Sequence, residues 1–320
     1  MKKSAKKRSG AKARKPARRL VPRSTGWREK RAGGAVVLIS PALEKLKWAV
    51  HGFSTRKGGA NKLDGARVLN LGFTEWDSPK SVEENRTVFL RALGAADRKL
   101  ITLRQIHSDV IHRVDKIPEQ PLSGDALITR VPGLLLGVQT ADCVPIILAD
   151  TKGHAVAAVH AGWRGTLARI VAKTIGRMHM EFGTHAEDIC AALGPCIARC
   201  SYEVGPEVAA AFAGQFPQAR DWFDVPRELR HSMVEGEIVA GEGPNPLKWL
   251  SMLPPGHDAP PPTVQLDLIA ANRWQLRDAG VPEKNISDSG ICTACRADLL
   301  FSHRREHGRT GRMLSAIGIL

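Results

Sequence analysis

The sequence predicts a globular protein of mixed α and β structure, on the basis of three observations. Short runs of aliphatic residues, such as 126–129 and 189–193, have the length and composition of buried strands. Other segments, such as 79–93, repeat apolar residues at helical spacing. The 320 residues, 43% of them hydrophobic, can build an ample core in one large domain or in two.

The first third of the chain contains two predicted strands and one predicted helix. The strands cover 35–39 and 49–53, and the second leads into a predicted loop, 54–59, whose two glycines permit unusual backbone angles. The helix is predicted over 79–93, because its apolar residues recur at roughly helical spacing and Gly94 is typical of a helix end.

The middle of the chain is predicted to be rich in strands. A high content of β-branched residues indicates an extended segment over 101–114. Shorter strands are expected at 126–129, 134–138, 144–148 and 155–160. After a loop, a helix is expected to start near Thr166. Its apolar face would consist of Leu167, Ile170, Val171, Ile175 and Met178.

The last third combines regular structure with a long insertion. A buried strand is predicted over 189–193, and a helix begins at 205–206, where proline is favourable. Residues 224–262 contain eight prolines, so we expect a surface insertion or flexible lid with no role in the core. Regular structure resumes with a helix over 266–279 and a final strand over 314–320.

Most of the positive charge lies at the N-terminus. Residues 1–31 hold 14 Lys and Arg residues and one acid, Glu29, a net charge of +13 that leaves only +2 of the overall +15 for the rest of the chain. The isoelectric point of about 9.9 therefore describes a basic tail, predicted to be disordered over 1–34. Contact of residues 1–31 with nucleic acid or a membrane surface stays an alternative.

Two absences in the sequence bear on the compartment. The longest apolar runs, near 133–138 and 144–149, are far shorter than the roughly 20 residues of a membrane-spanning helix, so no membrane insertion is expected. The N-terminus lacks the apolar stretch of a secretory signal, and six cysteines without such a signal favour a reducing compartment. We therefore expect a cytoplasmic protein.

His107, Cys143 and His160 form the first candidate site. Each lies in or near the end of a predicted strand, where side chains can point into a cleft. Two imidazoles and a thiolate are ligands that zinc prefers, and three protein ligands leave a fourth position open. The same residues would also suit a nucleophilic Cys143 with His107 or His160 as its base. Metal content distinguishes the two, because a zinc-bound thiolate is not free to attack carbon.

Two further groups compete for a role. Cys292-x-x-Cys295 followed by His303-x-x-x-His307 has the ligand types of a small zinc finger, but the link between the two pairs is short, so Cys292 and Cys295 are interpreted as packing residues. Arginines beside glycines are candidate anion-binding residues. They comprise Arg56, Arg164 and the group Arg304, Arg305, Arg309 and Arg312. A helix start just after Arg164 would add free N–H groups for a phosphate.

Five ordered segments resemble the YfiH family, whose members have been called laccase-domain or polyphenol oxidase proteins and are regarded as purine nucleoside phosphorylases. They are RQIHSDV at 104–110, QTADCVP at 139–145, AAVHAGWRG at 157–165, LGP at 193–195 and TGRM at 310–313. The resemblance covers about residues 35–320 apart from the insertion. It implies an α+β fold in a single domain, a four-layer α/β/β/α sandwich with mixed sheets.

The resemblance also implies a site and an activity. The family's His-Cys-His zinc ligands fall on His107, Cys143 and His160, which favours these residues over Cys292 and Cys295. The implied reaction is phosphorolysis of adenosine, inosine, guanosine or methylthioadenosine to the free base and ribose 1-phosphate, with adenosine deamination as a second activity. The implied partners are thus a purine nucleoside and phosphate; nothing indicates the oligomeric state.

Three other residues receive roles by inference. Arg56, in a segment resembling the family's Ser-Thr-Arg-x-Gly-Gly loop, is expected to bind phosphate or the purine nucleoside. A phosphate placed by Arg56 and Arg164 would balance the positive charge that develops on the sugar. Asp142 is a candidate proton carrier or an orienting neighbour of Cys143. Copper-dependent phenol oxidation is disfavoured, because several coppers normally need more His and Met ligands. Editing of cell-wall precursors is a further enzymatic alternative.

Overall fold

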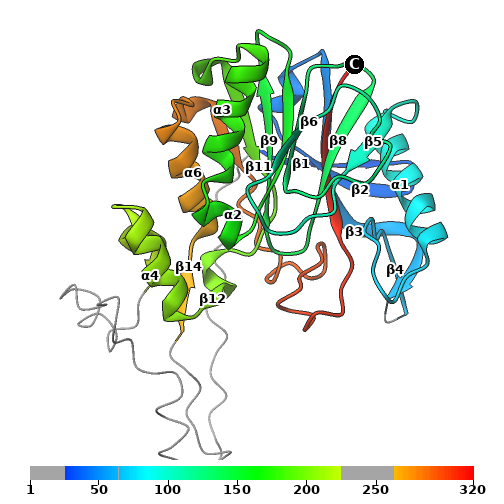
Figure 1. Cartoon of the computed structure of the whole chain (residues 1–320). Coiled ribbons are helices and arrows are strands. Elements are labelled where there is room, and N and C mark those ends of the chain that lie inside the picture. The colour runs from blue at the N-terminus through cyan, green and yellow to red at the C-terminus, as the bar shows by residue number, and fades with distance from the viewer. Residues whose placement is uncertain (1–25, 64, 225–262) are drawn as a thin grey trace, which may run out of the picture.

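The computed structural model describes residues 26–63, 65–224 and 263–320. Two mixed β-sheets form its centre, and helices cover their outer faces (Figure 1). The prediction of mixed α and β structure is confirmed. The predicted insertion at 224–262 lies outside the described residues except for Asp224, and so does most of the predicted basic tail.

The first sheet contains seven strands. Its order is β1 (Arg28–Ala32), β2 (Ala35–Ile39), β3 (Ala49–Leu63), β16 (Met313–Ile319), β8 (Leu134–Thr140) and β5 (Lys99–Thr102), with β4 (Ala66–Val68) paired to β3. Neighbours are antiparallel except for β5 and β8. Strand β16 joins the two halves of the sheet, because it pairs with β3 on one side and β8 on the other.

The second sheet contains six strands. Its order is β15 (Ile286–Asp288), β11 (Ile189–Leu193), β9 (Val144–Asp150), β10 (Val156–Ala161), β7 (Ala126–Thr129) and β6 (Ile111–Arg113). A small third sheet has the order β12 (Glu203–Val204), β14 (Val264–Leu266) and β13 (Phe223–Asp224).

Successive side chains of the central strands point to opposite faces of their sheet and so belong to different apolar clusters. In β8, Leu136 faces a cluster shared by the two large sheets, whereas its neighbour Leu135 belongs to a cluster with α1 (Pro79–Leu93). In β9, Ile147 joins the cluster between the sheets, and Ile146 faces the other side. Burial on both faces explains why these strands are nearly continuous runs of aliphatic residues.

Helices cover the outer face of each large sheet (Figure 1). Helix α1 packs Phe89 and Leu93 against the first sheet. The second sheet is covered by α3 (Ile170–Phe182) and α6 (Leu268–Asp278), which contact one another. The remaining described helices are α2 (Trp163–Leu167) and α4 (Pro206–Gln215). Among the described residues, no helix has the length and apolar character needed to cross a membrane.

Local signals predicted several elements well. The helix over 79–93 and the strands over 35–39, 126–129 and 189–193 have the predicted bounds. Gly94 ends α1 in a left-handed conformation with φ 79°. The strands predicted over 134–138, 144–148, 155–160 and 314–320 and the helices predicted at 205–206 and 266–279 differ only at their ends.

Four predictions are corrected. Residues 54–59, expected to be a loop, belong to β3, in which Gly58 (φ 104°) and Gly59 (φ 75°) accommodate an irregular register. The extended segment over 101–114 is divided into β5 and β6. The helix expected from Thr166 is two helices, because Arg169 adopts φ 60° between them. Finally, the tail does not extend to residue 34, since β1 pairs with β2 over five residue pairs.

Candidate metal centre

Three potential metal ligands meet at the ends of neighbouring strands. His160 lies in β10, Cys143 in the turn between β8 and β9, and His107 between β5 and β6. One ligand atom of each residue lies within 4.8 Å of the other two. The Cys143 Sγ and His107 Nε2 atoms are 3.9 Å apart, and the two imidazole rings meet edge to face with centroids 5.0 Å apart. The structure thus brings together the three residues of the first candidate site.

The charges in this group favour metal binding. Burial alone would raise the pKa of the Cys143 thiol, but His160 and His107 outweigh burial and lower it to about 6. Burial alone would lower the pKa of His160, yet Cys143 and Asp125 raise it to about 9. A thiolate beside an imidazolium can take up a cation when the imidazolium releases its proton. The same pair would suit a nucleophilic cysteine, so metal content remains the distinguishing measurement.

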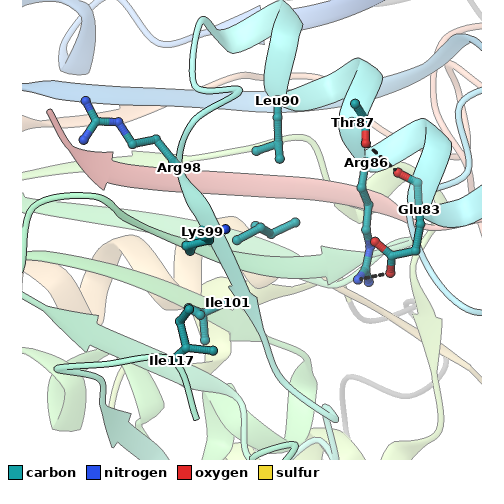
Figure 2. Close-up of a pocket in the computed structure, with 9 residues that line it drawn as sticks. Glu83, Arg86, Thr87, Leu90, Arg98, Lys99, Ile101 and Ile117 are labelled. Atoms are coloured by element: carbon teal, nitrogen blue, oxygen red, sulfur yellow. Dashed lines mark hydrogen bonds and ion pairs between the residues drawn. The ribbon is translucent and has the colours of Figure 1, made fainter. Parts of the chain in front are cut away.

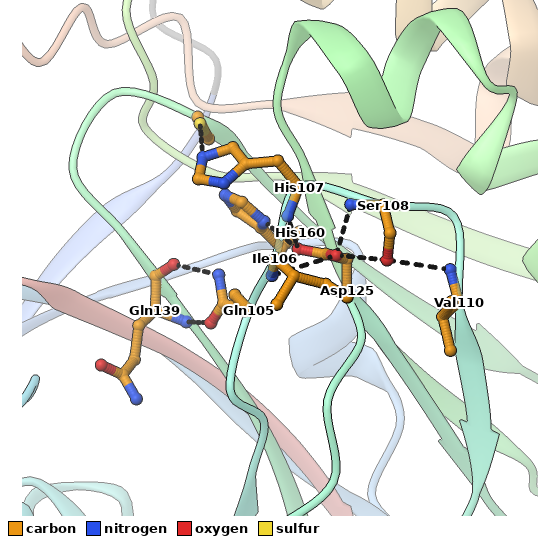
Figure 3. Close-up of polar contacts among 9 residues, drawn as sticks. Gln105, Ile106, His107, Ser108, Val110, Asp125, Gln139 and His160 are labelled. Atoms are coloured by element: carbon orange, nitrogen blue, oxygen red, sulfur yellow. Dashed lines mark hydrogen bonds and ion pairs between the residues drawn. The ribbon is translucent and has the colours of Figure 1, made fainter.

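Asp125, directly before β7, holds both histidines and was not identified from the sequence (Figure 3). Its buried carboxylate accepts a hydrogen bond from His160 Nδ1 at 2.8 Å and one from the His107 backbone N–H at 3.0 Å. The N–H and hydroxyl of Ser108 donate to Asp125 at 2.6 and 2.7 Å. Burial alone would raise the pKa of Asp125, but these donors lower it to about 2. The only signal in the sequence was an acidic residue immediately before a buried strand.

Two residues of the centre have left-handed backbone conformations. His107 has φ 57° and Asp142 has φ 97°, which is uncommon for residues other than glycine and is concentrated at functional sites. Both carboxylate oxygens of Asp142 are occupied: one accepts from the Thr293 hydroxyl at 2.6 Å and the other from the Arg304 backbone N–H at 2.7 Å. This arrangement favours an orienting role for Asp142, next to Cys143, over that of a proton carrier.

The space beside the ligands fits a bound ion. A Cβ atom at Gly162 would lie 3.1 Å from both Cys143 Sγ and His107 Cδ2, so any larger residue would crowd the donor atoms. Imidazole and thiolate are both ligand types that zinc binds, and three protein ligands would leave a fourth position for another ligand. The residues present therefore suit zinc.

The two arginines predicted to bind phosphate differ in their surroundings. Arg56 forms an ion pair with Glu306 at 2.8 Å, donates to the Ala297 carbonyl and stacks on Phe301, and its side chain is only 16% exposed. Arg164 is exposed in α2 and lies over the Trp163 ring. Because α2 spans only five residues, any role of Arg164 depends on its guanidinium group rather than on a helix terminus.

Two other residues near Cys143 complete the surroundings of the centre. Arg312 lies in a segment that the sequence analysis identified as basic. Burial lowers the pKa of Arg312, and the nearby charges of Cys143 and Asp142 partly oppose this effect. Tyr202, the chain's single tyrosine, has a raised pKa because of burial and the nearby Cys143, so its hydroxyl stays neutral. No motif marked Tyr202, since its position depends on contacts between distant segments.

The alternative zinc-finger arrangement is not formed. Cys292 and Cys295 lie near each other, but the third residue that could share a metal ion with them is Cys200 rather than His303 or His307. Cys292 is buried, as expected of a packing residue, whereas that interpretation is wrong for Cys295, which is exposed. A shared site of the two cysteines with His303 and His307, which the short link between the pairs had disfavoured, is thus not supported.

A surface pocket between α1 and β5 shares no residues with this centre (Figure 2). Its lining residues are Glu83, Arg86, Thr87, Leu90, Arg98, Lys99, Leu100, Ile101 and Ile117. None of them is a ligand or a described neighbour of His107, Cys143 and His160. We therefore assign no part of the candidate chemistry to this pocket.

Comparison with known proteins identifies the family. The family described as "Multi-copper polyphenol oxidoreductase laccase" matches residues 50–239 and 250–320. A purine nucleoside phosphorylase of Bacteroides thetaiotaomicron is 34% identical over 278 residues, which cover 84% of this chain and 91% of that protein. Adenosine deaminase RL5, from an unknown prokaryotic organism, is 34% identical over 86% of this chain and 98% of its own length.

A solved structure agrees with these matches. The crystal structure of the hypothetical protein YfiH of Bacillus licheniformis superposes with a TM-score of 0.73 at 28% sequence identity, covering 90% of this chain and 97% of that chain. The resemblance expected from the sequence is confirmed: the chain is structurally similar to YfiH and belongs to the multi-copper polyphenol oxidoreductase laccase family.

Proposed function

We propose that this protein is a zinc-dependent purine nucleoside phosphorylase. The observation that carries the proposal is the close group of His107, Cys143 and His160, whose ligand atoms lie within 4.8 Å of one another. A relative that is 34% identical over 84% of this chain is named a purine nucleoside phosphorylase, which supports the substrate class. The substrates would be a purine nucleoside and phosphate, and the products the free base and ribose 1-phosphate.

The ligands and their neighbours have distinct roles in this proposal. Zinc held by His107, Cys143 and His160 would supply a Lewis-acidic position for an oxygen atom of phosphate or nucleoside. Asp125 accepts a hydrogen bond from His160 Nδ1 and so leaves Nε2 as the ligand atom. Through the backbone of residues 107 and 108, the same carboxylate fixes the segment that carries the second imidazole.

Phosphate binding would depend on nearby arginines. Cleavage of the N-glycosidic bond builds positive charge on the ribose, and a phosphate held beside it can act as nucleophile and as electrostatic partner. Arg164 is exposed, and Arg312 lies within electrostatic reach of Cys143. We rank these two ahead of Arg56, because the ion pair with Glu306 already balances the Arg56 charge.

Adenosine deamination is a second candidate activity. It is favoured by the similarity to adenosine deaminase RL5 over nearly the whole of both chains. The two reactions are separable by their products, since deamination of adenosine yields inosine and needs no phosphate, whereas phosphorolysis yields adenine only when phosphate is present.

Copper-dependent phenol oxidation is the alternative that the family description suggests. Among the described residues, two groups offer three or more metal-binding side chains, and together they contain only two histidines. Multi-copper electron transfer normally uses many more imidazole ligands, so we place this reaction below nucleoside cleavage.

The proposal includes the architecture of the catalytic unit. Three of the apolar clusters, one between the large sheets and one beneath the helices on each outer face, support a single domain with four layers in the order α/β/β/α.

The decisive experiment compares zinc-loaded and metal-free protein incubated with adenosine and phosphate, followed by separation of the products. We expect adenine and ribose 1-phosphate from the zinc-loaded protein only, and their loss in Cys143→Ala. Cys190→Ala, which removes a buried thiol from the core between the sheets, is the matched control and should retain activity. If adenine is absent with the wild type, or forms undiminished with Cys143→Ala, the proposal is wrong.

A further inference from the structure

A second cluster of cysteines lies outside the candidate metal centre. It consists of Cys200 in a 3₁₀ turn (Arg199–Ser201), together with Cys292 and Cys295 in the segment before β16. One sulfur atom of each lies within 4.8 Å of the other two, and the Cys200 and Cys295 sulfur atoms are 3.6 Å apart. This group unites two segments that are more than 90 residues apart in the sequence.

The spacing of the sulfur atoms suits a shared metal ion. Zinc–sulfur bonds of about 2.3 Å at tetrahedral angles place two thiolates about 3.8 Å apart, close to the observed 3.6 Å between Cys200 and Cys295. A disulfide would require a separation of about 2.0 Å. The Cys292-x-x-Cys295 spacing is also common in zinc sites, where it lets both thiolates approach one ion.

The backbone already holds the two segments together. Cys196 and Cys292 form an isolated parallel bridge, and the Thr293 N–H donates to the Cys196 carbonyl at 2.9 Å. The Ala198 N–H approaches Cys292 Sγ at 3.4 Å. The three thiols are therefore positioned by contacts that do not involve an ion, which lowers the entropic cost of binding one.

Access to the cluster comes from the surface. Cys200 and Cys295 are exposed, and Cys292 forms the buried side of the group. Ser201 Oγ lies 3.5 Å from Cys295 Sγ and 3.7 Å from Cys292 Sγ, so a hydroxyl stands beside the thiols. An ion could enter from solvent and keep one position for water.

We propose that Cys200, Cys292 and Cys295 bind one Zn²⁺ ion that links two distant segments of the chain. On binding, the three thiols release their protons to solvent and form three zinc–sulfur bonds. Soft thiolate ligands select zinc over magnesium or calcium. The ion would fasten the Cys200 turn to the segment that contains Thr293, whose hydroxyl donates to Asp142 beside the first centre.

The test counts zinc ions bound per chain in protein without an affinity tag. Wild type, Cys143→Ala, Cys200→Ser, Cys295→Ser, Cys143→Ala/Cys295→Ser and the control Cys190→Ser are reduced, stripped with a chelator, reloaded with zinc and desalted without oxygen. Elemental analysis then gives the stoichiometry. Substituting the exposed Cys200 and Cys295 separately guards against the failure of one variant to fold.

We expect the Cys143→Ala protein to keep one ion and the Cys143→Ala/Cys295→Ser protein to keep none. Zinc should raise the melting temperature of the first but not of the second. Cys200→Ser and Cys295→Ser should each bind one ion fewer than Cys190→Ser. These comparisons do not depend on the catalytic proposal, since the first centre is disabled in the key pair.

Two results would overturn the inference. One is a Cys143→Ala protein that binds no zinc, or binds as much as Cys143→Ala/Cys295→Ser. The other is an intact protein mass that is lower by two hydrogen atoms after reloading, together with a disulfide mapped to Cys200 and Cys295. This result would identify the pair as a disulfide instead.

Discussion

Replacing Asp125 by asparagine should weaken zinc binding without abolishing the fold. The substitution keeps the size of the side chain, but it removes the negative charge opposite His160 and turns one acceptor oxygen into an NH₂ group. In the better of the two orientations, the remaining oxygen still accepts from His160 Nδ1 and the His107 N–H, which are 2.8 and 3.0 Å from Asp125 Oδ1. The NH₂ group then faces the Ser108 N–H, 2.6 Å from Oδ2.

The magnitude follows from these contacts. A buried N–H that loses its acceptor costs about 1–3 kcal/mol, so we expect the free energy of unfolding to fall by about 2 kcal/mol. Loss of the charged partner of a ligating histidine typically reduces metal affinity by about 10–100-fold. We expect an effect of that size for zinc, because Asp125 is the carboxylate bonded to His160.

A competing chelator that changes colour measures zinc affinity, and urea unfolding measures stability. Asp150→Asn is the matched control. Asp150 is a buried carboxylate that accepts from the Lys152 and Gly153 N–H groups, and it belongs to neither group of potential metal ligands. Both N–H groups donate to Asp150 Oδ1, so Asp150→Asn can keep both hydrogen bonds, and it should keep its zinc affinity. An Asp125→Asn protein that binds zinc as tightly as wild type, or an equal weakening in both variants, would refute the positioning role of Asp125.

Two further predictions concern space and pH. Gly162→Ala should lower zinc affinity and phosphorolysis by at least about tenfold, because its Cβ would lie 3.1 Å from Cys143 Sγ. The control Gly176→Ala, in open space in α3, should raise stability by about 1 kcal/mol and leave turnover unchanged. Equal activities of the two variants would contradict the crowding argument. Burial lowers the pKa of His51 from 6.5 to about 4, so the unfolded chain binds this proton more tightly and stability falls as the pH drops below 6.5. The contribution is about 2 kcal/mol between pH 7.5 and pH 5. It should be missing from urea unfolding of His51→Gln, which keeps an acceptor for the Ser40 N–H, and an unchanged pH dependence would count against it.

Local signals explain what the sequence could predict of the fold. Helix α1 was predicted over its whole length from the helical spacing of its apolar residues and from Gly94, which ends it. The structure adds two local signals at its start, the Ser78 cap and Pro79 at the first position. These signals act within a few residues. By contrast, the extension of β3 through residues 54–59 depends on pairing with β2 and β4, and pairing with distant strands leaves little trace in the local sequence.

The same distinction applies to the candidate centre. His107, Cys143 and His160 were identified because their side chains have characteristic metal chemistry and because the surrounding motifs resemble a family. Asp125 has neither advantage, since its importance comes from contacts with His160 and with the backbone of residues 106–108. Cys200 likewise gains its significance only from the fold, which places it beside two cysteines far along the chain.

The position of β16 has a consequence for synthesis of the protein. This strand is the last in the sequence, yet it lies between β3 and β8 and completes the first sheet. While the chain is being synthesised, the facing edges of β3 and β8 stay unpaired until β16 follows, and unpaired strand edges invite aggregation. The pairing of Met313 with Thr140 also brings Arg312 toward the turn that carries Cys143. Arg312 therefore joins the candidate centre only after β16, which follows β3 and β8 in the chain, has been synthesised and paired.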